Sequence, residues 1–135
     1  MRIAAVSDDG VTISQHFGRA PFYVVLTIEN GLVTQRERRE KMGHAQFAGE
    51  PQNEQAHDAD PRGHGFDNAA QSRHARMASA IHDCDALLAG GMGAGAYESF
   101  MQAGIRPVVT DINSIDEAVH AYLEGCLTNH TEWLH

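Results

Sequence analysis

A short apolar run, a glycine-rich loop and a helical pattern constrain the fold of this chain more than any other stretch. Residues 86–89 read Ala-Leu-Leu-Ala, which is typical of a strand buried on both faces. Four glycines follow between positions 90 and 95, so the backbone there can adopt positive φ or approach a neighbour or ligand closely. The apolar residues of one predicted helix face come next: Ala94, Tyr97, Phe100 and Met101.

Gly104 ends this predicted helix, and a second apolar run at residues 107–110 follows directly. Strand, helix and strand with short joints predict a right-handed βαβ unit in a parallel sheet. Such sheets bind ligands beyond the carboxyl ends of their strands. We therefore expect the functional site around residues 90–95.

The remaining pattern predicts a three-layer α/β domain with a mixed sheet. Residues 3–6 and 22–28 are apolar strand patterns, and Asn30-Gly31 predicts a tight hairpin into a charged edge strand at 32–39. A helix is expected from about residue 68, and a second one behind the capping box that Ser114 and Glu117 form. We expect one domain over residues 1–126 and a polar tail over 127–135.

Residues 42–67 interrupt this pattern with a long segment rich in Gly, Pro, Asn, Gln and Asp. A connection of this length and composition predicts a mobile or ligand-ordered loop. It contains His44, His57 and His64. None of the three forms an H-x-x-x-H pair, but together they could close over a metal.

The totals of the chain exclude several classes of protein. A formal net charge of −8 argues against a nucleic-acid-coating role. Two separate cysteines do not make a disulfide framework, so we expect a reduced, cytoplasmic protein. No apolar run in the sequence approaches the ~20 residues of a membrane span, so we expect none. A nucleophile elbow and an H-E-x-x-H zinc motif are both missing from the sequence, and we therefore expect no enzymatic activity.

The glycine loop is open to three interpretations. Residues 91–96 fit the G-x-G-x-x-A dinucleotide fingerprint, and Asp111 follows at the distance where that fingerprint places its ribose-binding acid. The loop could instead be only a tight strand-to-helix turn. It could also hold another anion, including a metal–sulfur cluster, on backbone N–H groups at a helix N-terminus.

His16 and Cys84 are the two further candidates for metal contact. His16 is followed by Phe17, Gly18 and Arg19, which offer an aromatic wall, room for close approach and a cation. Imidazole is a good ligand for iron and other transition metals. Cys84 lies in a stretch dense in ligand types, directly before the central strand, although a cysteine there is often buried and inert.

Two signatures resemble a known family. Residues 13–20, Ile-Ser-Gln-His-Phe-Gly-Arg-Ala, resemble the S-x-H-F-G-R-A signature of the dinitrogenase iron–molybdenum cofactor biosynthesis family. Residues 84–93 resemble its second signature, a cysteine, an apolar strand and a G-G-M-G turn. Residues 104–107 and 115–125 look like its closing pattern, so the likeness covers about residues 1–41 and 69–126.

The resemblance implies a ribonuclease-H-like α/β/α fold with a mixed five-stranded sheet and no nuclease carboxylates. It also implies a small cytoplasmic protein that binds or carries an iron–sulfur or iron–molybdenum precursor cluster, in metallocofactor assembly or nitrogen fixation. The positions that would then line the cluster pocket are His16, Phe17, Gly18, Arg19, Gly90, Gly91, Met92 and Gly93.

The metal ligands expected on this interpretation are His16, His44, His64 and Cys84. The long, cysteine-free loop at 42–67 departs from the family pattern and leaves another transition metal open as cargo. We expect metallocofactor assembly or acceptor proteins as partners, allow for a homodimer, and expect neither nucleic acid nor membrane. Two alternatives stay open: a nucleotide-binding domain that uses residues 91–96 with Asp111, and a divalent-metal-binding regulatory module.

Overall fold

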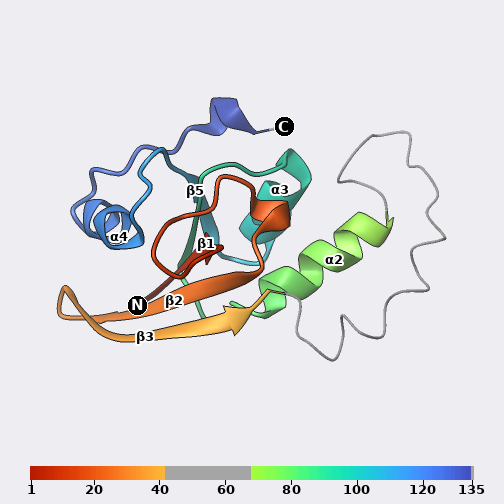
Figure 1. The fold of residues 1–135 in the computed structure, drawn as a ribbon. Helices are drawn as coiled ribbons and strands as arrows, with labels where there is room; N and C mark the ends of the chain where they lie inside the picture. The colour runs from red at the N-terminus through yellow and green to blue at the C-terminus, as the bar shows by residue number, and fades with distance from the viewer. Residues whose placement is uncertain (42–67, 135) are drawn as a thin grey trace.

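The computed structural model describes residues 1–41 and 68–134. The strands are β1 (Arg2–Ser7), β2 (Phe22–Glu29), β3 (Leu32–Glu40), β4 (Ala86–Ala89) and β5 (Arg106–Val109). The helices are α2 (Asn68–Ser79), α3 (Ala94–Gln102) and α4 (Ile115–Leu123), with short 3-10 turns η1 (Phe17–Arg19) and η3 (Thr131–Trp133). Figure 1 shows their arrangement.

The five strands form one mixed sheet in the order β3-β2-β1-β4-β5. β1 pairs antiparallel with β2 and parallel with β4, and β5 continues the parallel half. Asn30 and Gly31 both have positive φ, at 55° and 79°, as a two-residue turn between twisted strands requires. The predicted α/β class is confirmed, and this sheet order is compatible with the ribonuclease-H-like label.

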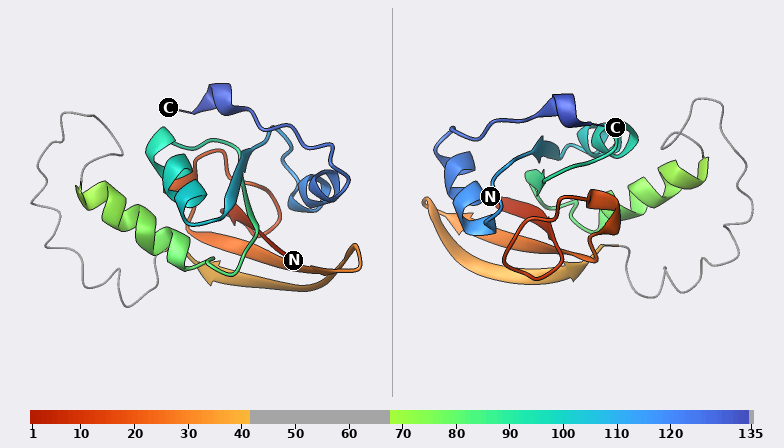
Figure 2. Two further views of the ribbon diagram at one scale, coloured as in Figure 1. Left: turned by 180° about the vertical axis from the view of Figure 1, so that it is seen from behind. Right: turned by 45° about the horizontal axis from the view of Figure 1, so that its top comes forward.

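Helices cover both faces of the sheet, which gives the three layers (Figures 1 and 2). α2 and α3 pack on one face, where the core includes Tyr23, Leu87 and Phe100. α4 packs on the other face, where Leu26 and Leu88 lie in the core. Neighbouring residues of β4 therefore enter different cores, because successive side chains of a strand point to opposite faces.

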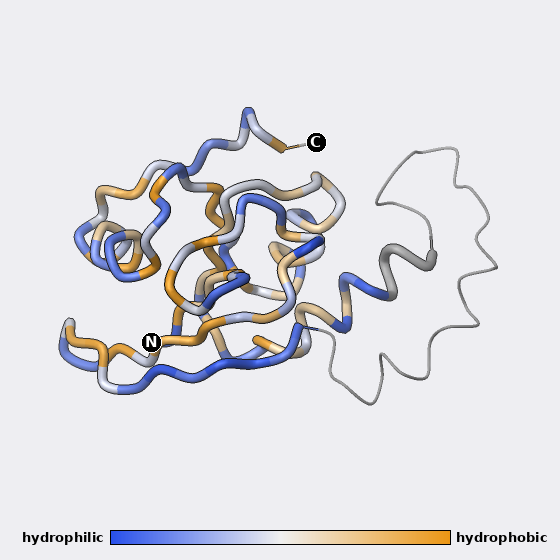
Figure 3. The backbone as a smooth tube through the Cα atoms, in the orientation of Figure 1, coloured by the Kyte–Doolittle hydropathy of each residue, from blue (hydrophilic) through white to orange (hydrophobic). Residues whose placement is uncertain are grey.

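β3 is the polar edge strand that the sequence predicts. Its hydrophilic colouring in Figure 3 contrasts with the apolar strands at the centre of the sheet. The Arg38 guanidinium lies 3.9 Å above the Phe22 ring, and the Arg36 guanidinium pairs with Asp116 of α4 at 2.8 Å. These charges leave an edge that resists pairing with other chains.

The predicted core face of α3 is partly wrong. Met101 is 54% exposed, and Ala94 and Tyr97 are only half-buried. The helix instead buries Ala96 and Phe100, which are four residues apart and therefore lie one above the other. Phe100 is three residues after Tyr97 and four after Ala96, so it fits both the predicted and the observed face. The periodicity alone could not decide which of the two faces is buried.

Residues 127–134 of the expected polar tail lie against the edge strand of the sheet. Asn129 Oδ1 accepts a hydrogen bond from the Val109 amide at 2.9 Å, and the His130 amide donates to the Val109 carbonyl at 2.8 Å. η3 follows and contacts β5. The tail thus occupies hydrogen-bonding positions that an edge strand would otherwise expose.

Within the two described stretches, we find no helix that is both long and apolar enough to span a bilayer.

Candidate functional site

The two signature stretches meet at the carboxyl ends of the parallel strands. The Gly90 amide donates to the Ser14 carbonyl at 2.9 Å, and the Phe17 amide donates to the Gly91 carbonyl at 3.0 Å. The Gln15 side chain reaches Asn113, beyond β5, at 3.4 Å. Three loops that are far apart in the sequence therefore form one rim, where α/β sheets bind ligands.

Close packing against the chain itself explains the first two glycines of the loop. A Cβ atom on Gly91 would lie 2.5 Å from the Gln15 carbonyl oxygen, and one on Gly90 would lie 3.0 Å from the Ser14 carbonyl oxygen. The expectation of positive φ is wrong here, since in the described residues that conformation occurs at glycines 10, 31, 104 and 125.

This packing weighs against the nucleotide interpretation. In the dinucleotide fingerprint, the glycines let the pyrophosphate approach the backbone. Here the space beside Gly91 is already occupied by the Gln15 backbone. Asp111 is exposed, with the His130 ring 3.9 Å from its carboxylate.

His16 is exposed on a turn that its neighbours hold in place. The Ser14 hydroxyl lies 3.2 Å from both the His16 amide and the His16 carbonyl. The same carbonyl accepts from the amides of Arg19 and Ala20 at 3.1 Å. The imidazole has no hydrogen bond or ion pair with any described residue, so its nitrogens are available to a ligand.

Residues 16–19 of the first signature have different environments. Gly18 and Arg19 are exposed beside His16, on the rim. Phe17 is buried, and its ring packs edge-on against Phe100 at a centroid distance of 5.4 Å. Phe17 therefore anchors the turn to the core rather than forming a wall of the site.

Lys41 follows β3 and contacts this turn, and the sequence analysis missed it. Its amine donates to the Phe17 carbonyl and lies 4.2 Å from the centre of the Phe17 ring. Burial lowers the pKa of the Lys41 amine to about 8, and the Asp8 carboxylate opposes this shift. The sequence signal was its position directly after β3, two residues beyond Arg39, whose side chain donates to the Ala80 carbonyl after α2.

The second signature supplies a helix N-terminus to the rim. Met92 is buried in the core, whereas Gly93 is half-exposed at the N-cap of α3. No side chain from the described segments caps this end. The free N–H groups of the first turn and the positive end of the helix dipole therefore favour an anion beside His16.

Cys84 lies at the opposite end of the sheet from His16. It precedes β4, whereas the glycine loop follows β4, and six residues of strand-like chain span about 20 Å. Its thiol is buried and lies 3.8 Å from the Asp83 carboxylate. Burial and the Asp83 charge raise the pKa of the Cys84 thiol to about 12, which disfavours the thiolate that metals bind.

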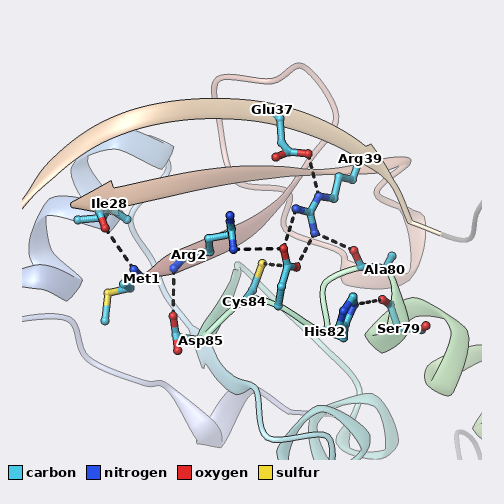
Figure 4. A network of polar contacts seen from close by, with 11 residues as sticks. Met1, Arg2, Ile28, Glu37, Arg39, Ser79, Ala80, His82, Cys84 and Asp85 are labelled. Atoms are coloured by element: carbon cyan, nitrogen blue, oxygen red, sulfur yellow. Dashed lines mark hydrogen bonds and ion pairs between the residues drawn. The ribbon is translucent and has the colours of Figure 1, made fainter.

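Asp83 belongs to a polar network that joins β3 to the turn before β4 (Figure 4). The Arg39 guanidinium donates to both Asp83 carboxylate oxygens, at 2.6 and 3.0 Å, and to the Ala80 carbonyl at 3.0 Å. The Arg39 hydrogen bonds hold the pKa of the Asp83 carboxyl well below its usual range. Every Arg39 donor that faces this turn thus has an acceptor, which is typical of a structural network.

The metal ligands expected from sequence are not gathered into one site by the described residues. No group of three or more His, Cys, Asp or Glu side chains that could hold a metal occurs in residues 1–41 and 68–134. His44, His57 and His64 lie outside these stretches. The structure thus brings His16, Gly18 and Arg19 close to the N-terminus of α3. It places Cys84 away from them.

The chain is similar in sequence to a known protein family. The family model described as dinitrogenase iron-molybdenum cofactor matches residues 1–125. The uncharacterized protein MJ0580 of Methanocaldococcus jannaschii is 28% identical over 127 residues, which are 94% of this chain and 89% of that protein.

Two solved structures share the fold. One is PH0822, with a TM-score of 0.66 and 22% identity, over 98% of this chain and 99% of the other. The second is the apo form of the orange protein from Desulfovibrio gigas, with a TM-score of 0.63 and 20% identity, over 96% and 92% of the two chains. The family match spans both signature stretches and the sheet that joins them, and this chain therefore belongs to the dinitrogenase iron-molybdenum cofactor family.

Proposed function

We propose that this protein is a non-catalytic carrier that holds an anionic metal–sulfur cluster and passes it on during metallocofactor assembly. The cargo is an iron–sulfur or iron–molybdenum precursor cluster, bound beyond the carboxyl ends of the parallel strands. The family match supports the assembly role. The observation that carries the proposal is the free imidazole of His16 on a braced turn, next to the uncapped start of α3.

Each group at this rim has a chemical part to play. The imidazole of His16 is a suitable ligand for iron. Arg19 and the first N–H groups of α3 would offset the negative charge of the cluster, which is needed on a chain with a net charge of −8. A site with a single strong ligand favours release, which a carrier requires.

The cysteines of the chain are consistent with such a labile site. Iron–sulfur clusters that are held permanently are bound by several thiolates. Cys84 lies before β4, and Cys126 follows α4, which begins near Thr12 and runs back along the sheet. Both thiols are therefore at the far end of the strands from His16.

The test is to measure cargo on protein purified without oxygen and without an affinity tag. Iron, molybdenum and acid-labile sulfide are quantified, with visible spectra, before and after incubation with an iron–sulfur cluster donor. We expect iron and sulfide to bind together with charge-transfer bands. His16→Ala should lower the retained cluster severalfold, and Arg19→Gln should weaken retention less.

His82→Ala is the matched control, because His82 is also exposed but lies near Cys84 at the other end of the sheet (Figure 4). Equal retention by His16→Ala and His82→Ala would contradict the proposal. Bound metal without sulfide would instead favour the divalent-metal module. On the carrier proposal, the partners are assembly or acceptor proteins of the cytoplasm, and transfer to such a protein should empty the site.

A further inference from the structure

A groove with no assigned role lies along the outer flank of β5. Its volume is about 530 Å³, within the range of small-molecule sites. Tyr97 and Met101 of α3 form one wall, and Tyr122 and Leu127 form the other. Arg106, the first residue of β5, lines the end away from His16, so the groove is separate from the candidate cluster site.

The backbone of β5 in this groove is already satisfied. The outward Val109 amide donates to Asn129 Oδ1, and the outward Val109 carbonyl accepts from the His130 amide. Pro107 has no N–H, and its carbonyl accepts from Asn129 Nδ2 at 3.5 Å. A peptide strand therefore cannot add to this edge through backbone hydrogen bonds.

The groove offers a free cation and hydroxyl groups beside apolar surface. No described residue forms a hydrogen bond or ion pair with the Arg106 guanidinium, whose N–H groups are all donors. The Tyr97 hydroxyl accepts from Asn129 Nδ2 at 2.9 Å, which leaves its own proton free to donate. The Met101 side chain is 54% exposed and adds a flexible apolar surface to the groove.

We infer that this groove binds a small organic anion with an apolar body, such as an aromatic carboxylate. Arg106 receives the carboxylate. Met101 and Leu127 contact the apolar part. Arginine suits this role because its planar fork matches a carboxylate.

The test is an NMR titration of the full chain with phenylacetate, with the neutral phenylacetamide as its isostere. We expect saturable shifts of the Met101 methyl group and of the Tyr97 and Tyr122 amides with phenylacetate. Arg106→Gln should weaken binding by about tenfold, the usual value of a charged hydrogen bond. Arg38→Gln removes an equal charge from β3, at the opposite edge of the sheet, and should leave the affinity unchanged.

Three results would overturn this inference: equal binding of phenylacetamide, equal affinity of the two arginine variants, or shifts that avoid Met101. Cluster loading does not enter the experiment, so its outcome is independent of the proposed carrier function. Arg106 is exposed on the folded chain, and the amide spectrum of Arg106→Gln shows directly whether the fold is retained.

Discussion

Gly91 shows at the scale of one residue how the two signature stretches depend on each other. Gly91→Ala would place a Cβ atom 2.5 Å from the Gln15 carbonyl oxygen, a backbone atom that cannot rotate away. We expect a loss of about 2–3 kcal/mol in the free energy of unfolding, as for other overpacked sites. Gly18→Ala is the matched control, since nothing lies within 4 Å of its added Cβ. Urea unfolding of both variants checks this, and equal stabilities would refute it.

Lys41 gives the stability of the chain a pH dependence. Burial lowers the pKa of its amine from 10.5 to about 8, so between these values the unfolded chain binds more protons than the folded chain. The free energy of unfolding should therefore rise with pH across this window, by at most about 3 kcal/mol. Below pH 8 the buried charge is present in full and its cost is greatest.

Comparison of the wild type with Lys41→Met isolates this effect. The Cys84 thiol works in the opposite direction above pH 9, because burial raises its pKa to about 12, but it does so in both proteins. The unfolding free energy of both proteins is measured by urea titration from pH 7 to 10. The wild type should become more stable relative to Lys41→Met as the pH rises. A constant difference would show that the Lys41 amine is not buried as described.

At the scale of elements, short sequence patterns predicted the features that depend on residues close together in the chain. The predicted N-cap is present, since the Ser114 hydroxyl accepts from the Glu117 amide at 3.2 Å, and the Asn30–Gly31 turn joins β2 to β3. The core face of α3 and the tail were not predictable in this way. Asn129 acts on Val109, 20 residues away, and no periodicity in the sequence encodes such a contact.

The same limit applies to the candidate site. The two signature stretches could be found from sequence, and so could the carboxyl ends of the strands as the place where they meet. The burial of Phe17 and the position of Lys41 could not, because both depend on the packing of η1 against α3 and β3. The separation of Cys84 from His16 follows from the direction of β4, which the sequence did contain.

Asn129 binds the tail to the edge of the sheet through its hydrogen bond to Val109 of β5. Asn129→Ala would leave the Val109 amide without its acceptor and remove the bond to the Tyr97 hydroxyl. We expect a loss of about 1–3 kcal/mol, the cost of an unsatisfied buried donor. Thr128→Ala, at an exposed neighbour, should be nearly neutral. Thermal unfolding compares the two, and equal midpoints would mean that the tail does not support β5.

At the scale of the whole molecule, one sheet joins two cores, and no residue of 1–41 or 68–134 belongs to both. Leu87 faces α2 and α3, and Leu88 faces α4, although the two residues are adjacent in β4. The tail is tied to both cores, because Leu127 packs on the α4 side and Leu134 on the α3 side. This connectivity favours a single cooperative unfolding transition.

Leu87→Ala and Leu88→Ala test that cooperativity. Each removes a fully buried side chain from a different core, and each should cost about 2–5 kcal/mol. Trp133, the single tryptophan, stacks on His130 at 4.1 Å and reports on the tail, while circular dichroism reports on the sheet and helices. We expect both probes to give one midpoint in the wild type and a common, lower midpoint in each variant. If Leu88→Ala shifted the circular dichroism midpoint but not that of Trp133, the two faces would unfold as separate units. In that case only the core beneath α2 and α3 would stabilise the rim at the carboxyl ends of the strands.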